Sequence, residues 1–538
     1  MDRPTELDHT LARLMRGGAI RPAIDGAPDS FLLALHSLEL VWLSDFDAAA
    51  RCAARAVADA RDPDARALAR AAASIAKACC TDLEITATLN DPLSAALADP
   101  APLTAALARP VWALLAEGAL AGARLDLATP LLARMRATDG ELFGVVRHPF
   151  AVFICALEAR ASMFRGDVSQ ARVHADAGIA AADGAVPTLF ARGCAALVAG
   201  SADERARTRA LIAEVERSDV PIVDAVTRGC RVLAAFAAIA IGEHGRASRL
   251  IVLAGGDEDL SHLRIIDRAW GFEMLVAEAA SRGDARGAAR WHERAQVLAR
   301  HPMATASLDR MASHRALLDG SFDTAIAVSE RSARDARRQQ RGVEAIEAEI
   351  LLARSRIAAH RSGDAARALT DLAASALDSG HRSARRAAGR ELRRIGRRLP
   401  PATPGWAGLS PREQEVATLL ARGLSNAQIA RAMFVSEATV RVHVSRILRT
   451  LGVPTRSAIG AADPSPPAAK SLPPLTRRQR AVAELIATGA TNKHIAAKLG
   501  IGVPTVEKHV AAVFARWGVR SRAEVARLVR QEPPPTAA

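Results

Sequence analysis

The sequence predicts an all-α protein in which an array of helical hairpins is followed by two small four-helix domains. Half of the 538 residues are hydrophobic, mostly Ala and Leu, while 3% are aromatic and none is Tyr. This composition favours helices, because strands prefer β-branched and aromatic side chains. Glycine-centred turns recur roughly every 40 residues, which is the span of one helix pair in a helical repeat. The last quarter of the chain contains one stretch twice.

The chain from about residue 5 to residue 398 alternates Ala-rich amphipathic segments with short polar turns. The predicted turn glycines are Gly122, Gly166, Gly200, Gly242, Gly283, Gly320 and Gly363. Asp follows Gly166, Gly283 and Gly363. Gly can adopt the left-handed conformation that ends one helix, and Asp can cap the next helix. Each turn therefore predicts one helical hairpin.

These hairpins resemble tetratricopeptide repeats in degenerate form. The resemblance implies that residues 1–380 form a tetratricopeptide-like helical repeat domain with a sensor or interaction role. Stacked helix pairs make an extended concave surface that suits a peptide, a protein or a small ligand. Nothing in the sequence names that ligand. The alternative is an irregular all-α domain without a superhelix.

Residues 381–408 form a distinct segment, an Arg-rich helix followed by a Pro/Gly linker. Eight arginines between Arg382 and Arg398 fall at i, i+3, i+4 spacing and so share one helix face. Ala388 and Leu392 belong to the opposite, apolar face. The arginines form either a solvated face at a helix C-terminus or a surface that contacts phosphates beside the following domains.

The stretch Leu409–Ile459 is repeated as Leu475–Val525. An offset of 66 residues superposes Gly423 on Gly489, Asn426 on Asn492, Thr439 on Thr505 and His443 on His509. In the first copy we expect helices over 411–422, 426–433 and 437–451, and a fourth helix that begins near Thr455. A helix, a short turn and a second helix is the geometry that lays the second helix in the major groove of DNA.

Both copies resemble the helix-turn-helix domain of the LuxR family of bacterial transcription regulators. The family carries a motif resembling T-V-K-x-H-V, and this chain has T-V-R-V-H-V from Thr439 to Val444. The resemblance implies LuxR-type domains at 409–462 and 475–530, joined by a Pro-rich linker at 463–474. It also implies DNA contacts from Arg441, Val442 and Ser445. Arg in place of Lys keeps the charge and adds a bidentate contact for guanine.

The predicted recognition helices share a frame but differ on the face that would meet DNA. In the first copy the predicted DNA-binding residues are Thr439, Arg441, Val442, His443, Ser445, Arg446 and Arg449. In the second copy they are Thr505, Glu507, Lys508, His509 and Ala511. Glu507 repels phosphate but can accept from cytosine N4. We expect the first copy to make most base contacts, with the second binding weakly, reading other bases or contacting protein. His443 either meets a phosphate or is a packed, hydrogen-bonded histidine.

The function implied by the resemblance is a DNA-binding transcription regulator. Its helical repeats would sense a ligand or a partner protein, and its C-terminal domains would bind promoter DNA in the major groove. The net charge of +14 and the pI of about 10.7 agree with a polyanionic partner. RNA polymerase is a further expected partner. The alternative is a helical-repeat protein-interaction scaffold with degenerate helix-turn-helix domains.

The two copies are expected to form a dimer or an intramolecular pseudo-dimer. The extended linker reaches on the order of 40 Å, and successive half-sites on DNA are about 34 Å apart. LuxR-type domains usually pair through their fourth helices. The duplication therefore favours a covalent pseudo-dimer on one operator.

The sequence offers no chemistry for an enzyme. It contains no G-x-x-x-x-G-K-[ST] phosphate loop and no nucleophile–base pair, so we expect no catalytic residues and no cofactor. We expect no metal, since no cysteine has metal-site spacing. The N-terminus has no signal-peptide pattern and no stretch of about 20 apolar residues could span a membrane, which predicts a cytoplasmic protein.

Overall fold

The computed structural model describes residues 2–17, 29–98, 103–138, 141–143, 145, 147–399, 406, 409–433, 435–451, 453, 456–459, 475–517, 519 and 522–531. The chain divides into two compact units, residues 1–399 and 400–538. Among the described residues the only strand-like pairing is one isolated bridge between Leu142 and Val145, which confirms the all-α prediction. No described helix is both long enough and apolar enough to cross a membrane. No three His, Cys, Asp or Glu side chains in this part of the chain form a group that could hold a metal ion.

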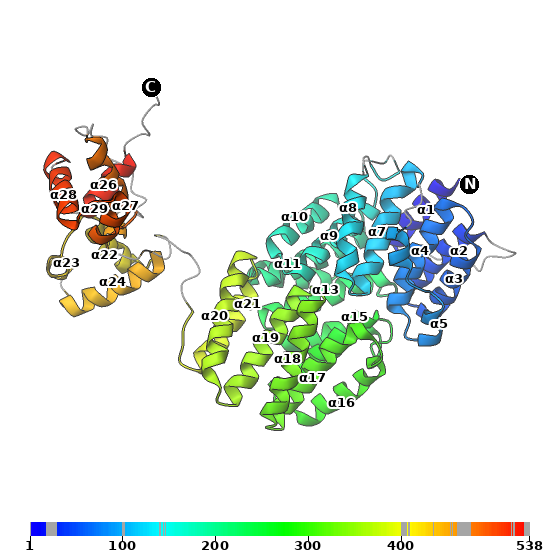
Figure 1. The fold of residues 1–538 in the computed structure, drawn as a ribbon. Coiled ribbons are helices and arrows are strands. Elements are labelled where there is room, and N and C mark those ends of the chain that lie inside the picture. The colour runs from blue at the N-terminus through cyan, green and yellow to red at the C-terminus, as the bar shows by residue number, and fades with distance from the viewer. Residues whose placement is uncertain are drawn as a thin grey trace. The chain divides into compact units, whose positions relative to one another are not determined.

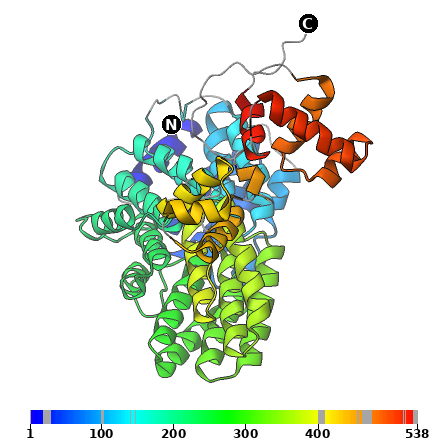
Figure 2. The ribbon, with the colours of Figure 1, turned by 90° about the vertical axis from the view of Figure 1, so that its left-hand side faces the viewer.

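The first unit is a stack of helical hairpins (Figures 1 and 2). Its first helices are α1 (Arg3–Arg16), α2 (Ser30–Trp42), α3 (Phe46–Asp59), α4 (Pro63–Cys79), α5 (Leu83–Ala87), α6 (Pro92–Ala98), α7 (Ala105–Ala121) and α8 (Leu125–Ala137). They are followed by α9 (Phe150–Arg165), α10 (Val168–Ala181), α11 (Ala185–Ser201), α12 (Arg205–Glu216), α13 (Ala225–Ile241), α14 (His244–Gly255), α15 (Ile265–Ser281) and α16 (Ala285–Ala295). The unit ends with η1 (Gln296–Leu298), η2 (Pro302–Ala304), α17 (Thr305–Leu318), α18 (Phe322–Arg338), α19 (Gly342–Ala358), α20 (Ser362–Asp378) and α21 (Arg382–Arg394). This is the predicted tetratricopeptide-like array.

The predicted Gly-Asp turn is seen where α9 meets α10. Gly166 is left-handed, with φ of 85°, and the Asp167 side chain accepts from Gln170 N at 2.9 Å. The predictions for two other glycines were wrong, because Gly200 lies inside α11 and Gly363 inside α20. Gly200 has a packing role instead, since a Cβ there would lie 3.0 Å from Ala237 O on α13.

The array closes on itself, so that hairpins far apart in sequence lie side by side. Val168 N donates to Ser379 O at 3.1 Å, and α19 packs against α9. Gly342, at the start of α19, leaves no room for a side chain, because an added Cβ would lie 2.5 Å from Arg165 O. These contacts hold the C-terminal hairpins of the unit against its middle.

Helix α21 is the last helix of the array. Ala384, Ala388 and Leu392 are buried against the neighbouring hairpin, as the predicted apolar face requires. Arg386 contacts the middle of the array. It forms an ion pair with Asp203, after α11, at 2.9 Å and donates to Ala240 O of α13. The arginine face is therefore partly used within the first unit.

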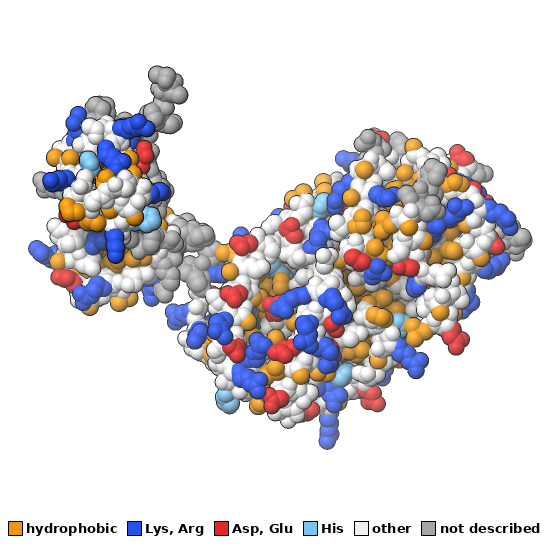
Figure 3. All heavy atoms as spheres, viewed as in Figure 1, with side chains coloured by type: hydrophobic (Ala, Val, Ile, Leu, Met, Phe, Trp, Pro, Cys, Tyr) orange, Lys and Arg blue, Asp and Glu red, His pale blue; other side chains and the backbone are white. Residues whose placement is uncertain are grey.

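The surface of the first unit carries interspersed positive and negative side chains (Figure 3). Many of them pair between neighbouring hairpins, such as Arg246 with Glu216 at 2.6 Å and Arg361 with Asp323 at 2.9 Å. Exposed pairs of this kind contribute roughly 0–1 kcal/mol each to stability. They show that positive and negative side chains are paired locally on this surface.

The second unit contains both copies of the repeated stretch. The first copy consists of α22 (Pro411–Ala421), α23 (Asn426–Met433), α24 (Glu437–Leu451) and α25 (Arg456–Ile459). The second consists of α26 (Arg477–Ala487), α27 (Asn492–Leu499), α28 (Val503–Trp517) and α29 (Arg522–Gln531). Each copy has its own hydrophobic core, and α25 packs against α29. The predicted linker at 463–474 lies outside the described residues.

Candidate nucleic-acid interface

Each copy begins with a reciprocal cap that fixes the start of its first helix. In the first copy Glu413 N donates to Ser410 Oγ at 3.3 Å, and Ser410 N donates to Glu413 Oε2 at 2.9 Å. In the second copy Gln479 N donates to Thr476 Oγ1 at 3.3 Å, and Thr476 N donates to Gln479 Oε1 at 3.0 Å. Such capping boxes satisfy amide groups that the helix itself leaves unpaired.

A second shared feature is an arginine that ties the fourth helix to the turn before the second helix. Arg522 donates to Asn492 Oδ1 and to Ala490 O, both at 2.7 Å. Arg456 makes the matching contacts with Asn426 Oδ1, at 3.5 Å, and with Leu424 O. Burial lowers the pKa of both guanidinium groups. Sequence reasoning missed this clamp, although Arg and Asn recur in both copies at the same offset.

The recognition helix of the first copy, α24, begins as predicted behind Ser436, whose Oγ accepts from Thr439 N at 3.1 Å. Val440 and Ile447 are fully buried in the domain core. The residues left on the outer face are exposed, and they are Thr439, Arg441, Val442, Ser445 and Arg446. Val442 is 60% exposed. The helix thus presents one polar, basic face with an apolar spot in its centre.

Three of the predicted residues need a separate description. Arg446 lies 3.4 Å from Glu413 Oε1, so it is tied to the cap of α22. Burial of Glu413 acts against ionisation, but hydrogen bonds from Ser410 and Arg446 outweigh it and lower the pKa of Glu413. His443 is half-buried, and its Nδ1 has no hydrogen-bond partner among the described residues. Arg449 belongs to α24, but its side chain lies outside the described part.

The recognition helix of the second copy, α28, has the same inner stripe and a different outer face. Val506 and Val513 are fully buried, matching Val440 and Ile447 at the 66-residue offset. The exposed residues are Thr505, Glu507, Lys508 and Ala511, while His509 is half-buried. Arg446 is matched by Ala512. The exposed predicted residues of each copy thus lie on the outer face of its recognition helix, and among the described side chains only the first face is strongly basic.

The capped helices, the tight turns between them and the exposed faces of α24 and α28 define a pair of helix-turn-helix domains. The family described as "Bacterial regulatory proteins, luxR family" matches residues 407–460 and residues 473–529. The C-terminal region thus carries two LuxR-type helix-turn-helix domains, homologous to those of transcriptional regulators.

Relatives match over short segments only. A Mycobacterium tuberculosis protein described as an HTH-type transcriptional regulator is 44% identical over 61 residues, which is 11% of this chain and 7% of that protein. The two-component response regulator PprB of Pseudomonas aeruginosa is 39% identical over 64 residues, 12% of this chain and 23% of PprB. The nitrate/nitrite response regulator NarL of Escherichia coli is 42% identical over 48 residues, 9% of this chain and 22% of NarL. The matches therefore cover less than a third of each of these relatives.

Two solved structures align with this chain at low similarity. A Rap protein complexed with Competence and Sporulation Factor gives a TM-score of 0.37 at 11% identity, covering 68% of this chain and 96% of that chain. The Cut9-Hcn1 hetero-tetramer of APC/C gives 0.40 at 14% identity, covering 72% and 77%.

Proposed function

We propose that this protein is a transcription regulator whose first LuxR-type domain reads promoter DNA. The observation that carries the proposal is the outer face of α24, where Arg441, Val442 and Ser445 are exposed above a fully buried stripe. These are the positions at which the LuxR motif implies contacts to bases and phosphates. An exposed basic face on a helix of this kind supplies both the attraction to phosphates and the groups that read bases.

The chemistry of these side chains suggests a role for each. Arg441 can donate two hydrogen bonds to O6 and N7 of one guanine, and the methyl groups of Val442 can pack on the C5-methyl of thymine. Ser445 can donate to or accept from a base edge or a phosphate. Arg446 can contact a phosphate if it leaves Glu413, which holds it at 3.4 Å in this structure. Base reading is thus assigned chiefly to Arg441 and Val442.

The second domain is proposed to act with the first as an intramolecular pseudo-dimer. The contact between α25 and α29 supports this proposal, because it joins the fourth helices of the two copies. Lys508 would supply charge to the backbone, while Glu507 would limit or redirect base contacts. The test compares DNase footprints of the intact chain and of a chain ending at residue 474. If the chain ending at residue 474 gives the same footprint and affinity as the intact chain, the pseudo-dimer proposal is contradicted.

A second function, a protein-interaction scaffold, is supported by the second copy alone. Glu507 and Ala511 are exposed at positions where the LuxR motif implies DNA contacts. A face without strong positive charge is better suited to a protein partner such as RNA polymerase than to phosphates. In either case the helical repeats are proposed to sense a ligand or a partner.

The proposed function is tested by genome-wide footprinting of the intact protein, followed by binding of Arg441→Ala to the sites found. We expect the variant to lose roughly tenfold to a hundredfold in affinity, from a contact worth about 1–3 kcal/mol, and to relax the base preference at one position. Arg422→Ala is the matched control, because it removes the same charge from an exposed residue at the end of α22. Unchanged affinity and base preference in Arg441→Ala would contradict the assignment.

A further inference from the structure

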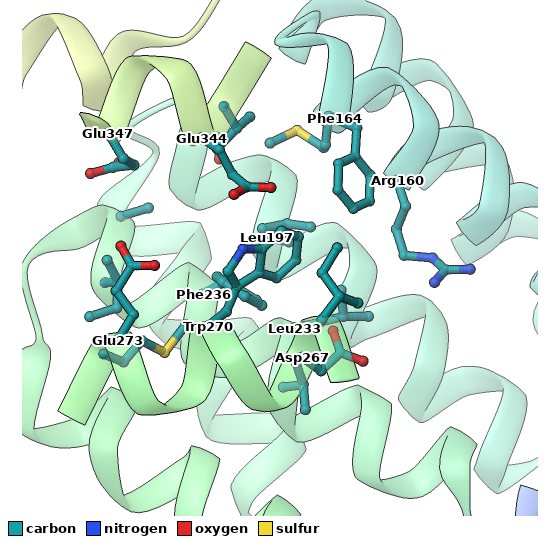
Figure 4. A pocket seen from close by; sticks show the side chains of 18 of the residues that line it. Arg160, Phe164, Leu197, Leu233, Phe236, Asp267, Trp270, Glu273, Glu344 and Glu347 are labelled. Atoms are coloured by element: carbon teal, nitrogen blue, oxygen red, sulfur yellow. The ribbon is translucent and has the colours of Figure 1, made fainter. Parts of the chain in front are cut away.

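The array of the first unit lines a cavity of about 410 Å³, which is partly open to solvent (Figure 4). Small-molecule sites typically have volumes of about 300–1,000 Å³. Its wall comes from the first helices of successive hairpins, including α9, α13, α15, α17 and α19, and from α21. Aromatic rings form part of this wall. Phe236 meets Trp270 edge-on, with ring centroids 5.0 Å apart, and Phe164 lies 5.4 Å from the same indole.

Most arginines of the cavity wall already have a carboxylate partner. Arg160 and Arg264 both pair with the fully buried Glu117, which lies behind the wall. Arg310 pairs with Glu273 at 2.6 Å and with Glu344 at 3.3 Å. The positive charge of these three arginines is therefore already compensated by carboxylates of the protein.

Two carboxylates of the wall have no such partner. Asp267 and Glu347 line the cavity and make no hydrogen bond or ion pair with any described residue. In Figure 4, Asp267 lies on one side of Trp270, Glu347 and Glu273 lie on the other, and Glu344 lies above the indole. Desolvation raises the pKa of both Asp267 and Glu347, and the neighbouring charge of Glu273 raises that of Glu347 further. Arg264 and Arg160 lie near Asp267, and Arg310, Arg354 and Arg390 lie near Glu347, but neither carboxylate forms an ion pair with any of them.

Two arginines and two histidines lie near these carboxylates. Arg354, on the same helix as Glu347, donates to Glu391 at 3.0 Å. Arg390 lines the cavity and, like Glu347, is exposed, and the two side chains interact without forming an ion pair. His381 lines the cavity, is 3% exposed, and its Nδ1 has no hydrogen-bond partner among the described residues. Burial lowers the pKa of His381 to about 4 and that of His314 to about 3, so both rings are neutral near pH 7. His381 can therefore offer a hydrogen bond to a ligand without adding positive charge.

We infer that this cavity binds a small organic cation with an apolar body. The cationic group would lie beside Glu347 and Glu273, and the apolar body would pack against Trp270 and Phe236. An anionic ligand would meet Asp267 and Glu347 and would have to compete with carboxylates for most of the wall arginines. Arg228, which donates to Ala254 O, and Arg390 are the exceptions, so binding of an anionic probe is the decisive control.

The ligand would bridge parts of the array that are far apart in sequence. Asp267, Trp270 and Glu273 belong to α15, whereas Glu347 belongs to α19, the helix that packs against α9 at the ring closure. A bound cation would therefore favour one arrangement of these hairpins. Only this consequence rests on the sensing role proposed above, because binding itself can be measured without DNA.

The test uses the intact protein and three primary ammonium ions of increasing size: benzylammonium, 2-phenylethylammonium and 1-naphthylmethylammonium. Calorimetric titration is the readout. Because the chain has six tryptophans, the site is located by comparing the fluorescence quenching of the native protein with that of Trp270→Phe. We expect saturable binding of at least one cation and much weaker binding of the neutral 2-phenylethanol and the anionic 3-phenylpropanoate. Failure of all three cations to saturate, or equal binding of the neutral or anionic probe, would overturn the inference.

Variants then test the residues. Glu347→Gln and Asp267→Asn keep the side-chain shape, and each is expected to weaken cation binding by roughly tenfold or more, since a hydrogen bond to a charged group contributes about 1.5–3 kcal/mol. Glu349→Gln is the matched control, because Glu349 lies two residues along the same helix and pairs with Arg337 outside the cavity. Unchanged binding in both Glu347→Gln and Asp267→Asn would reject the site.

DNA footprints of the same proteins separate this inference from the proposed function. Cation binding that leaves the footprint unchanged upholds the cavity as a cation site and removes its sensing role. Cation binding by a protein that occupies no specific DNA site upholds the cavity and contradicts the regulator proposal instead.

Discussion

The two LuxR-type domains share one skeleton and present two different outer faces. At the 66-residue offset, buried Ile429 matches buried Ile495, and the clamp made by Arg456 matches the clamp made by Arg522. On the outer face Arg441 is matched by Glu507. Core and outer residues lie on opposite sides of the same helix, so one set can change while the other is kept. A duplicated domain can therefore keep its fold while its binding surface diverges.

The largest expected effect tests the shared skeleton. Ile429→Ala and Ile495→Ala each remove a fully buried side chain, and each should cost its domain about 2–5 kcal/mol of stability. Amide hydrogen exchange of α23 and α27 in the intact chain reports the two domains separately. Val442→Ala, on the exposed face of α24, is the control and should leave exchange unchanged. A large loss in one domain and none in the other would break the structural equivalence of the copies.

The next effect tests the arginine clamp. Arg522→Ala removes the donors to Asn492 Oδ1 and Ala490 O, and leaving partly buried acceptors unpaired costs about 1–3 kcal/mol. Arg456→Ala should cost less, because its contact to Asn426 is longer, at 3.5 Å. The same exchange experiment, read at the turns before α23 and α27, ranks the two variants. Exposed Arg516, changed to Ala, serves as the control for loss of charge. Equal protection in Arg522→Ala and the native chain would show that the clamp is not structural.

Much of this skeleton could be predicted from the sequence, because it depends on local patterns. Helices predicted at 426–433 and 437–451 have those same bounds, since Ser, Gly and apolar spacing act within a few residues. The ring closure of the first unit could not be predicted in this way. It joins Val168 to Ser379, and the pattern of a helix shows its apolar face but not which distant hairpin covers that face. The cavity and its unpaired carboxylates follow from that closure.

A smaller effect on DNA affinity is expected from a change on the outer face of the second copy. Glu507→Arg gives the second copy the basic residue that the first copy has at Arg441. We expect a gain in DNA affinity of severalfold, since a repulsion between Glu507 and the phosphates is replaced by an attraction. Binding is measured by fluorescence anisotropy with the sites found by footprinting. Glu484→Arg, on the exposed surface of α26, controls for the general change in net charge. If both variants gain equally, the face of α28 does not approach DNA.

The smallest expected effect separates phosphate contact from base reading on α28. Lys508 is exposed beside Glu507, and one Lys–phosphate contact contributes about 0.9 to the slope of log K against log salt concentration. Lys508→Ala should therefore lower the magnitude of that slope by about one while affinities for different DNA sequences fall in parallel. Arg441→Ala should instead change the ranking of DNA sequences. If Lys508 contacts a phosphate, its removal reduces the number of counterions that leave the DNA on binding, and the slope must fall. An unchanged slope in Lys508→Ala would therefore contradict a phosphate contact from this helix and would favour protein contacts for the outer face of α28.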